Sequence, residues 1–358
     1  MKGNRERTGY ILNVVMALAT ATSLVACGVF AALYYKEHEE VQAVMSENAV
    51  LKETQMQEVI FQETSTITDE KMEQLLASKE AEVESSLKEK MKELVTAQNG
   101  GPLTMLREFF PENLIYYDEK AYVFAPVLDS VKKHNLKDEN FRMNDDGEME
   151  YVENGTVVSH KGIDVSKYQG EIDWDKVQAD GVEYAFIRLG LRGYESGKLV
   201  LDEYYEQNMR GANESGVKAG VYFFTQAVTV EEAVEEAEFV IENLADFDVP
   251  YPVVFDVEMI VGSNGRANSL TQAERTDICI AFCEAMKEAG YTPMIYGNVK
   301  CFTNLLDMPR LENYEKWYAF YDDYMYMPYE VSIWQYTEEG SVDGIKGKVD
   351  MNIAYKTW

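Results

Sequence analysis

The sequence predicts an α/β protein whose last part, residues 160–358, folds as an abbreviated TIM-like β/α barrel. From residue 162 onward, eight apolar runs of strand length follow one another, and helix-like stretches at 203–215, 230–244 and 271–289 separate several of them. The later runs have short links, and the segment has about 200 residues, fewer than the roughly 250 of a full barrel. We therefore expect a closed but shortened barrel. The runs are 162–165, 184–189, 220–224, 253–258, 292–297, 316–321, 331–336 and 348–352.

The amino-terminal part predicts a membrane anchor. Residues 8–35 carry no charged side chain, and this run is longer than the roughly 20 residues that cross a bilayer. Three basic residues lie within 1–7 and acidic residues follow the run, so the positive-inside rule places 1–7 in the cytoplasm and the remainder outside. We expect a single-pass protein with an extracellular barrel. The alternative is a lipoprotein, because the sequence LVAC, which ends at Cys27, resembles a bacterial lipoprotein box.

Residues 36–100 predict a helical stalk. They are rich in Glu, Lys, Gln, Ser and Thr, contain no Pro, and place apolar residues from Met72 to Leu94 at helical spacing. A homodimeric coiled coil would cover this apolar stripe, although charged residues such as Lys79 and Lys90 interrupt the heptad pattern. The cluster of Gly and Pro at 100–102 ends the helix.

Residues 101–159 predict a small β-rich connector. Strand-like runs occur at 114–117 and 121–127, and a hairpin is indicated at 148–160 because Asn154-Gly155 lies between two alternating runs. These residues show no pattern that indicates chemistry, so we interpret the connector as a spacer that orients the barrel.

The charge of the chain argues against two classes of partner. Its 63 acidic residues exceed its 33 basic ones, which gives a net charge of −30. Nucleic acid and anionic lipid surfaces would repel such a protein. We therefore expect no nucleic-acid partner.

Histidines and cysteines exclude several hydrolytic mechanisms. His38, His134 and His160 all precede the first expected strand at 162–165, so a Ser-His-Asp triad, a Cys-His pair or a histidine zinc site cannot be built at the strand ends of the barrel. Cys279 and Cys283 share one face of an expected helix without a histidine nearby, which favours core packing over metal binding. We expect neither a metal nor a cofactor.

Paired carboxylates mark the candidate catalytic site. The sequence FDVE places Asp256 and Glu258 two residues apart at the end of an apolar run, and in a strand such residues face the same side. Two acids in one site, one protonated and one charged, are the machinery of glycosidic bond cleavage. Asp164 closes the first run and Asp350 the last, and barrel chemistry lies where strands end. Closure of the barrel would therefore bring four carboxylates to one mouth.

Aromatic residues accompany these acids. Rings can stack on the apolar faces of sugars, although we expect about half of these rings to belong to the core. A chitinase-like D-x-x-D-x-D-x-E motif is excluded because Tyr251 and Val254 occupy the positions of its other acids. The aromatic residues near the strand ends are Tyr168, Tyr222, Phe224, Tyr296, Tyr321, Trp334 and Tyr336.

Five motifs in fixed order resemble one enzyme family. They are GIDVSKYQG at 162–170, GVYFF at 220–224, FDVE at 255–258, IYGN at 295–298 and WQY at 334–336, and the ending at 342–352 agrees as well. Together they resemble the family 25 glycoside hydrolases, the lysozymes also called Chalaropsis-type muramidases. The resemblance covers about 160–358 and nothing before it.

The resemblance implies a lysozyme-type enzyme that hydrolyses the β-1,4 bond between N-acetylmuramic acid and N-acetylglucosamine in peptidoglycan. It implies that Glu258 is the proton donor and that Asp256 is the charged partner, which either attacks the sugar or steers its 2-acetamido group. Asp164 and Asp350 would hold the sugar at the −1 site. The expected substrate contacts are Tyr168, Tyr222, Tyr296, Trp334 and Gln335.

An alternative of another class stays open. A membrane-tethered barrel of this kind could bind peptidoglycan as a scaffold of an envelope assembly without cutting it. All four acids of the family are present, which favours the enzyme.

Overall fold

The structure is a computed structural model that describes residues 69–97, 100–118, 120–262 and 264–358. The expected membrane segment at 8–35, the alternative lipid site at Cys27 and the first half of the expected stalk lie outside these residues. Within the described ranges, no helix combines the length and apolar character needed to cross a bilayer. The chain divides into two compact units, with the boundary in the sequence between Tyr122 and Val123.

Among the residues that the structure describes, the first unit contains two helices and a strand: α3 (Asp69–Thr96), α4 (Pro102–Phe109) and β1 (Asn113–Tyr117). The described part of the expected stalk is indeed helical. Its apolar residues Leu75, Val83 and Leu87 are between 41% and 50% exposed. The short helix α4 was not expected; it begins with Pro102, whose missing N–H costs nothing in the first turn.

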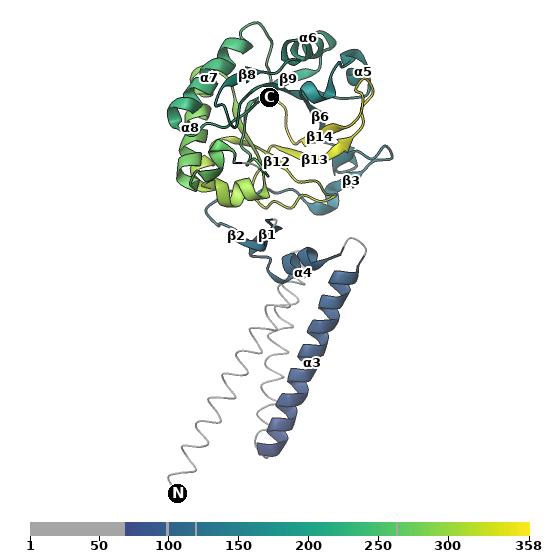
Figure 1. Ribbon diagram of the computed structural model, residues 1–358. Helices are drawn as coiled ribbons and strands as arrows, with labels where there is room; N and C mark the ends of the chain where they lie inside the picture. Colours follow the sequence, from purple (N-terminus) through teal and green to yellow (C-terminus); the bar gives the residue numbers. More distant parts are fainter. Residues whose placement is uncertain (1–68, 98–99, 119, 263) are drawn as a thin grey trace. The chain divides into compact units, whose positions relative to one another are not determined.

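The second unit is built around a closed barrel, as expected. In the described part of the chain, one sheet has the strand order β6-β14-β13-β12-β11-β10-β9-β7-β8, and an additional pairing of β6 with β7 closes the ring. All eight predicted runs form strands. Figure 1 shows the helices α5 to α8 outside this ring. The strands are β6 (His160–Val165), β7 (Tyr184–Arg192), β8 (Leu199–Leu201), β9 (Lys218–Phe224), β10 (Val253–Asp256), β11 (Pro293–Asn298), β12 (Glu315–Ala319), β13 (Ile333–Gly340) and β14 (Val349–Ala354).

The last strand differs from the expected arrangement. Neighbouring strands are parallel along the series β6, β7, β9, β10, β11, β12 and β13. The strand β14 is antiparallel to both of its neighbours, β13 and β6. A strand can reverse here because β13 and β14 are joined by a short link, whereas a parallel neighbour needs a crossover of a dozen or more residues. Asp350 therefore lies near the start of its strand, not at its end.

The three predicted helices form α6 (Tyr205–Ser215), α7 (Val230–Leu244) and α8 (Gln272–Glu288). Thr271 caps α8 in a capping box with Glu274, and Thr229 caps α7. The elements that the sequence did not reveal are short: α5 (Trp174–Ala179), β8, η2 (Lys167–Gln169), η3 (Arg266–Ser269), η4 (Cys301–Leu305) and η5 (Met308–Leu311).

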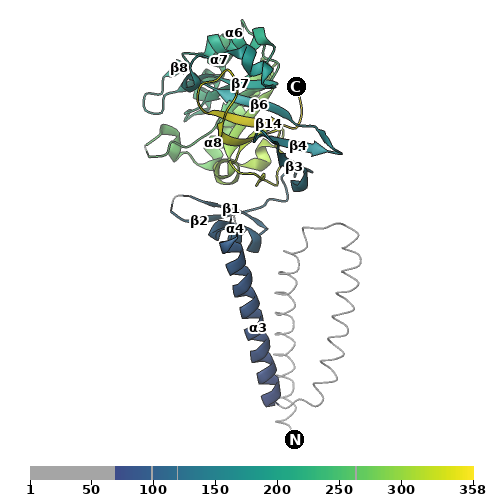
Figure 2. The same cartoon turned by 90° about the vertical axis from the view of Figure 1, so that its right-hand side faces the viewer.

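Residues 123–159 belong to the same compact unit as the barrel. Asn154 and Gly155 both have positive φ, at 51° and 80°, so the predicted hairpin turn is confirmed. The Phe141 ring packs on Trp334 at 5.4 Å between centroids, and Figure 2 shows β3 and β4 beside the barrel strands. The remaining elements of this segment are β2 (Tyr122–Pro126), η1 (Asp138–Asn140), β3 (Phe141–Met143), β4 (Met149–Glu153) and β5 (Thr156–Val157).

Glycine makes room for rings inside the barrel. A Cβ at Gly162 would lie 2.1 Å from the ring of Tyr184, and one at Gly220 would lie 2.4 Å from the ring of Phe186. Both rings belong to the buried cluster that fills the barrel below the mouth. The glycine at 162 is therefore a packing requirement of the first strand.

Replacing Gly162 with Ala is expected to lower the free energy of unfolding by about 3 kcal/mol, the upper end of the usual cost of overpacking. Urea unfolding followed by tryptophan fluorescence measures this loss. Adding Tyr184→Leu should recover part of it, because the shorter side chain removes the clash. Equal stability of Gly162→Ala and wild type would contradict this account.

Candidate active site

Four carboxyl groups meet at the mouth of the barrel. Asp256 ends β10, Glu258 follows it by two residues, and Asp164 lies next to the last residue of β6. Asp350 is paired directly with Asp164 across β14 and β6. The expectation that these acids share one site is met, but Asp350 reaches it from the start of an antiparallel strand.

The alternation of β10 explains which side chains face inward. Val254 belongs to the buried cluster inside the barrel, whereas the Phe255 ring stacks on Phe282 of helix α8 at 4.2 Å. Asp256 shares the inward face with Val254 because strand side chains alternate. The next ladder bond, from the Val257 N–H to the Tyr296 carbonyl oxygen, continues this geometry beyond the strand.

Burial raises the pKa of all four carboxyl groups. It raises the pKa of Asp164 to about 6 and, together with the charge of Asp164, the pKa of Asp350 to about 8. The pKa of Asp256 is raised well above its ordinary value by burial and then by the neighbouring Glu258 and Asp164. Burial and Asp350 likewise raise the pKa of Glu258. The cluster therefore retains protons near neutral pH, as acid catalysis requires.

Among the four acids of the described residues, Asp256 has a buried oxygen atom without a hydrogen-bond partner. It is 6% exposed, and its Oδ1 atom is buried without a hydrogen-bond partner among the described residues. A buried polar atom left unpaired is costly and calls for a functional explanation. The charge of Arg188 is the one influence that lowers the pKa of Asp256.

Asp164 is fixed by two amide groups. Gln335 Nε2 and Asn352 Nδ2 both donate to its Oδ2 atom, at 2.7 and 2.8 Å. The hydroxyl groups of Tyr296 and Tyr321 donate to Gln335 Oε1 at 2.8 and 3.1 Å, which sets the orientation of that amide. Asp164 Oδ2 is therefore a fixed acceptor, and any proton on this carboxyl group resides on Oδ1.

The predicted substrate contacts fall into three environments. Tyr168 is 78% exposed, with the Arg188 guanidinium 5.2 Å from its ring centre. Tyr222 and Tyr296 lie against Trp317 inside the mouth, and burial raises the pKa of both hydroxyl groups well above the ordinary value.

Trp334 lies elsewhere. Its side chain is fully buried, its ring packs on Phe141 and Tyr336, and its Nε1–H donates to the carbonyl oxygen of Phe320 at 2.7 Å. Because Gln335 faces the mouth, its neighbour Trp334 faces the outer side of β13. The structure does not bring Trp334 to the four carboxyl groups.

Three further residues of the site were not singled out from the sequence. Arg188 pairs with Asp202 through Nε and Nη2, at 2.7 and 2.6 Å, and Trp317 Nε1 donates to Asn352 Oδ1 at 2.7 Å. Asn352 could have been suspected, because it lies two residues after Asp350 on the same strand face. Arg188 and Trp317 gave no signal, since each lies inside one of the predicted strand runs, 184–189 and 316–321.

Cys279 and Cys283 lie in the core, as expected. Cys279 and Cys283 are fully buried free thiols, and burial raises the pKa of both. A high thiol pKa disfavours the reactive thiolate. These residues contribute packing and no chemistry to the mouth.

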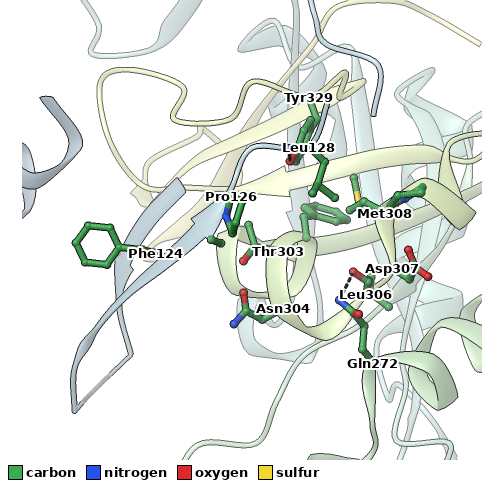
Figure 3. Close-up of a pocket in the computed structure, with 13 residues that line it drawn as sticks. Phe124, Pro126, Leu128, Gln272, Thr303, Asn304, Leu306, Asp307, Met308 and Tyr329 are labelled. Atoms are coloured by element: carbon green, nitrogen blue, oxygen red, sulfur yellow. Dashed lines mark hydrogen bonds between the residues drawn. The ribbon is translucent and has the colours of Figure 1, made fainter. Parts of the chain in front are cut away.

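A separate pocket of about 360 Å³ lies on the outside of the barrel (Figure 3). It is bounded by residues 124–128 on one side and 302–309 on the other, and Gln272 Nε2 donates to the Leu306 carbonyl oxygen beside it. None of the four acids lines this pocket. We therefore assign the chemistry to the barrel mouth.

The fold and the site define a glycoside hydrolase of lysozyme type. The chain belongs to glycosyl hydrolases family 25, because the model of that family matches residues 163–345, just over half of the chain. This match includes Asp164, Asp256 and Glu258 and ends before Asp350.

The chain is also similar to individual proteins. The chain is 30% identical over 203 residues to the uncharacterized protein YegX of Escherichia coli K12, a match that covers 54% of this chain and 68% of that protein. It is 25% identical over 198 residues to an autolytic lysozyme of Clostridium acetobutylicum, a match that covers 54% of this chain and 55% of that lysozyme.

A solved structure supports the same fold. The modular autolysin LytC of Streptococcus pneumoniae, determined with a synthetic peptidoglycan ligand, superposes with a TM-score of 0.51 and 27% identity. The match covers 60% of this chain and 52% of LytC, so the chain spans about half of that relative.

Arg188 gives a prediction for the pH dependence of hydrolysis. Its positive charge lowers the pKa of Asp256, so Arg188→Gln should raise that pKa and move the acidic limb of the pH–rate profile upward by about one unit. Arg188→Lys keeps the charge and serves as the control, with a profile close to that of wild type. An unchanged acidic limb in Arg188→Gln would show that Arg188 does not tune Asp256.

Proposed function

We propose that this protein is a peptidoglycan hydrolase, an N-acetylmuramidase that cleaves the β-1,4 bond between N-acetylmuramic acid and N-acetylglucosamine. The observation that carries the proposal is the set of four carboxyl groups with raised pKa at one barrel mouth, of which Asp164 and Asp256 are buried. Two relatives support the choice of substrate: an autolytic lysozyme, and an autolysin solved with a peptidoglycan ligand.

In the proposed mechanism, Glu258 gives its proton to the leaving glycosidic oxygen. Its raised pKa supports this role, because the group must be protonated when the substrate binds. Asp256, as the anion, stabilises the positive charge that develops on the sugar ring. Substrate binding in the mouth would supply the polar partner that Asp256 Oδ1 lacks among the described residues.

The part that Asp256 takes in bond formation has two forms. Its carboxylate either attacks the sugar and forms a glycosyl-enzyme, or orients the 2-acetamido group of the substrate as the internal nucleophile. A substrate with a 2-hydroxyl in place of the 2-acetamido group distinguishes them, because only the first route would cleave it.

The remaining residues of the mouth bind the sugar. Asp164 is held rigid by Gln335 and Asn352 and is suited to accept a sugar hydroxyl through its free oxygen. Tyr222 and Tyr296 form the aromatic wall. Tyr168, the most exposed ring, offers a stacking face for a more distant sugar unit.

We also propose that the enzyme acts from the outer face of the cell membrane, as a single-pass protein with a cytoplasmic amino terminus. The uncharged run at 8–35 and the basic residues before it support this topology. A helical stalk of about 60 residues would reach roughly 90 Å, so the enzyme would remodel nearby wall only. The exposed apolar residues of α3 are the proposed contact for a second copy.

Protease treatment of intact cells tests the topology. A tag at the carboxyl terminus should be removed without lysis, and its protection would overturn the proposed orientation. Resistance of the membrane association to carbonate extraction, together with an unmodified Cys27, would separate the spanning anchor from a lipoprotein.

The function itself is tested on purified peptidoglycan. The protein should solubilise the wall and release new reducing ends, and borohydride reduction of these ends should yield muramitol. Glucosaminitol as the product would place the cut at the other glycosidic bond. Wall binding with no release of reducing ends would instead support the non-catalytic scaffold.

A further inference from the structure

The carboxyl group of Glu258 depends on its backbone for position. It forms no hydrogen bond to another residue in the described part of the chain, and its charged neighbours there are acids: Asp350 raises its pKa, and Glu258 in turn raises the pKa of Asp164 and Asp256. Glu258 also lies two residues beyond the end of β10. The segment that follows the strand must therefore be held by other means.

The residues around Glu258 are anchored on both sides. Before it, the Val257 N–H donates to the Tyr296 carbonyl oxygen at 3.2 Å. After it, the Asn268 side chain binds both backbone groups of Ile260: the Ile260 N–H donates to Asn268 Oδ1 at 3.0 Å, and Asn268 Nδ2 donates to the Ile260 carbonyl oxygen at 2.8 Å. One amide side chain thus replaces the pairing strand that this segment lacks.

The close approach of the two segments has a steric requirement. A Cβ at Gly265 would lie 2.7 Å from Ile260 Cγ1 and 3.1 Å from Asn268 Oδ1. The absence of a side chain at Gly265 allows Ile260 to reach the amide of Asn268. The contact is therefore built into the packing of the loop.

The short helix η3, which carries Asn268, is itself held by three other elements. The Arg266 N–H donates to the Tyr194 carbonyl oxygen of the loop after β7, and its guanidinium pairs with Glu232 of α7 at 2.7 Å. Arg275 of α8 donates to the Ala267 carbonyl oxygen at 2.6 Å. The helix η3 is a fixed support onto which Asn268 ties the segment of Glu258.

Gln226 makes a second, weaker connection. This side chain is fully buried in the loop after β9, donates to the Glu258 carbonyl oxygen at 3.5 Å and accepts from the Ala267 N–H at 3.4 Å. Gln226 therefore joins the backbone of Glu258 to helix η3. Both connections restrain the backbone and leave the Glu258 carboxyl group free for the substrate.

We infer that Asn268 is a positioning residue for the proton donor: its two hydrogen bonds to Ile260 hold the Glu258 carboxyl group in reach of the leaving oxygen. This inference rests on the proposed function of Glu258. A displacement of about 1 Å can cost on the order of 10²-fold in rate. Loss of Asn268 should therefore reduce the rate of proton donation without removing any substrate contact.

The test compares Asn268→Ala with two other variants of the full chain. Asn243→Ala is the matched control, because Asn243 also donates from its side chain to a backbone oxygen, that of Phe239, but on helix α7. Asn268→Asp retains an acceptor for the Ile260 N–H and should keep part of the activity. Thermal unfolding and circular dichroism confirm that each variant is folded.

The readout is the dependence of the rate on the leaving group. On peptidoglycan, Asn268→Ala should lower kcat about 30-fold with KM within threefold of wild type. On aryl glycosides of a wall disaccharide, the loss should shrink to less than threefold for a dinitrophenol leaving group, which departs without a proton. Asn243→Ala should match wild type on both substrates.

Two outcomes overturn the inference while wild type stays active. One is wild-type kcat in Asn268→Ala; the other is an equal loss on both kinds of substrate, which would show a general structural effect. Failure of the proposed function is distinct, because wild type itself would then release no reducing ends. If Asn268→Ala does not fold, the same comparison is made on Asn268→Asp. An intermediate loss of kcat on peptidoglycan alone would then support the inference, and no such loss would refute it.

Discussion

Glu258→Gln is expected to abolish wall hydrolysis, lowering kcat on peptidoglycan by on the order of 10³-fold. Glutamine keeps the size and polarity of the side chain but cannot donate the proton that the leaving oxygen needs, and general acid catalysis typically contributes 10²- to 10⁴-fold. Release of reducing ends from purified peptidoglycan measures the loss. Binding to the same peptidoglycan in a sedimentation assay should be retained, because the mouth is otherwise unchanged.

Glu238→Gln provides a matched control for this variant. Glu238 is an exposed residue of α7, so the substitution makes the same chemical change away from the mouth. It should leave kcat within twofold of wild type. Equal activity of Glu258→Gln and wild type would remove Glu258 from the mechanism.

Asp256→Asn is expected to combine a large loss of activity with a gain in stability. The substitution removes the anion that supports the developing positive charge, and loss of one such electrostatic group costs on the order of 10²- to 10³-fold in kcat. Turnover of peptidoglycan measures the first effect. The melting temperature at neutral pH measures the second.

The sign of the stability effect follows from the pKa of Asp256. Burial and nearby acids raise this pKa in the folded state, so folding favours the protonated form. Stability is therefore lost as the pH rises from about 4, where the unfolded chain begins to ionise, toward the folded pKa. Asparagine does not ionise, so Asp256→Asn should melt above wild type at pH 7, and the difference should narrow toward pH 4.

Several results would contradict this account of Asp256. A melting temperature below that of wild type at pH 7 would show that Asp256 contributes favourable interactions that outweigh its burial. Retained turnover would show that another group supplies the negative charge. Glu242→Gln, on an outer helix, controls for the loss of one negative charge from an acidic protein.

The barrel could be predicted because its signals are local. Each of the eight apolar runs has the length and composition of a buried strand, and Asn154-Gly155 has the backbone preference of a hairpin turn. The short helix α4 and the strand β8 were missed because so few residues carry little periodicity. The reversed direction of β14 was missed for another reason: a strand has the same sequence pattern in either direction.

The candidate site was predictable in part. Asp256 and Glu258 share a strand face by spacing alone, and their meeting with Asp164 followed from the closure of a barrel. The hydrogen bonds and ion pairs around these acids could not be predicted from the sequence. Arg188 of β7 acts through space on Asp256 of β10, and Asn268 binds the backbone of Ile260 eight residues before it; no periodic sequence pattern records either contact.

The sequence by itself determined the residue types and their order: an acid pair at the end of one apolar run, single acids in the first and last runs, and a family resemblance that assigns them roles. The tertiary structure alone decided how these groups behave. Closure of the sheet brought four carboxyl groups together and removed them in part or wholly from solvent, which raised the pKa of each. The last strand runs antiparallel to the first, so Asp350 lies opposite Asp164. The pKa of an acid depends on burial and on neighbouring charges, and these quantities exist only once the chain has folded.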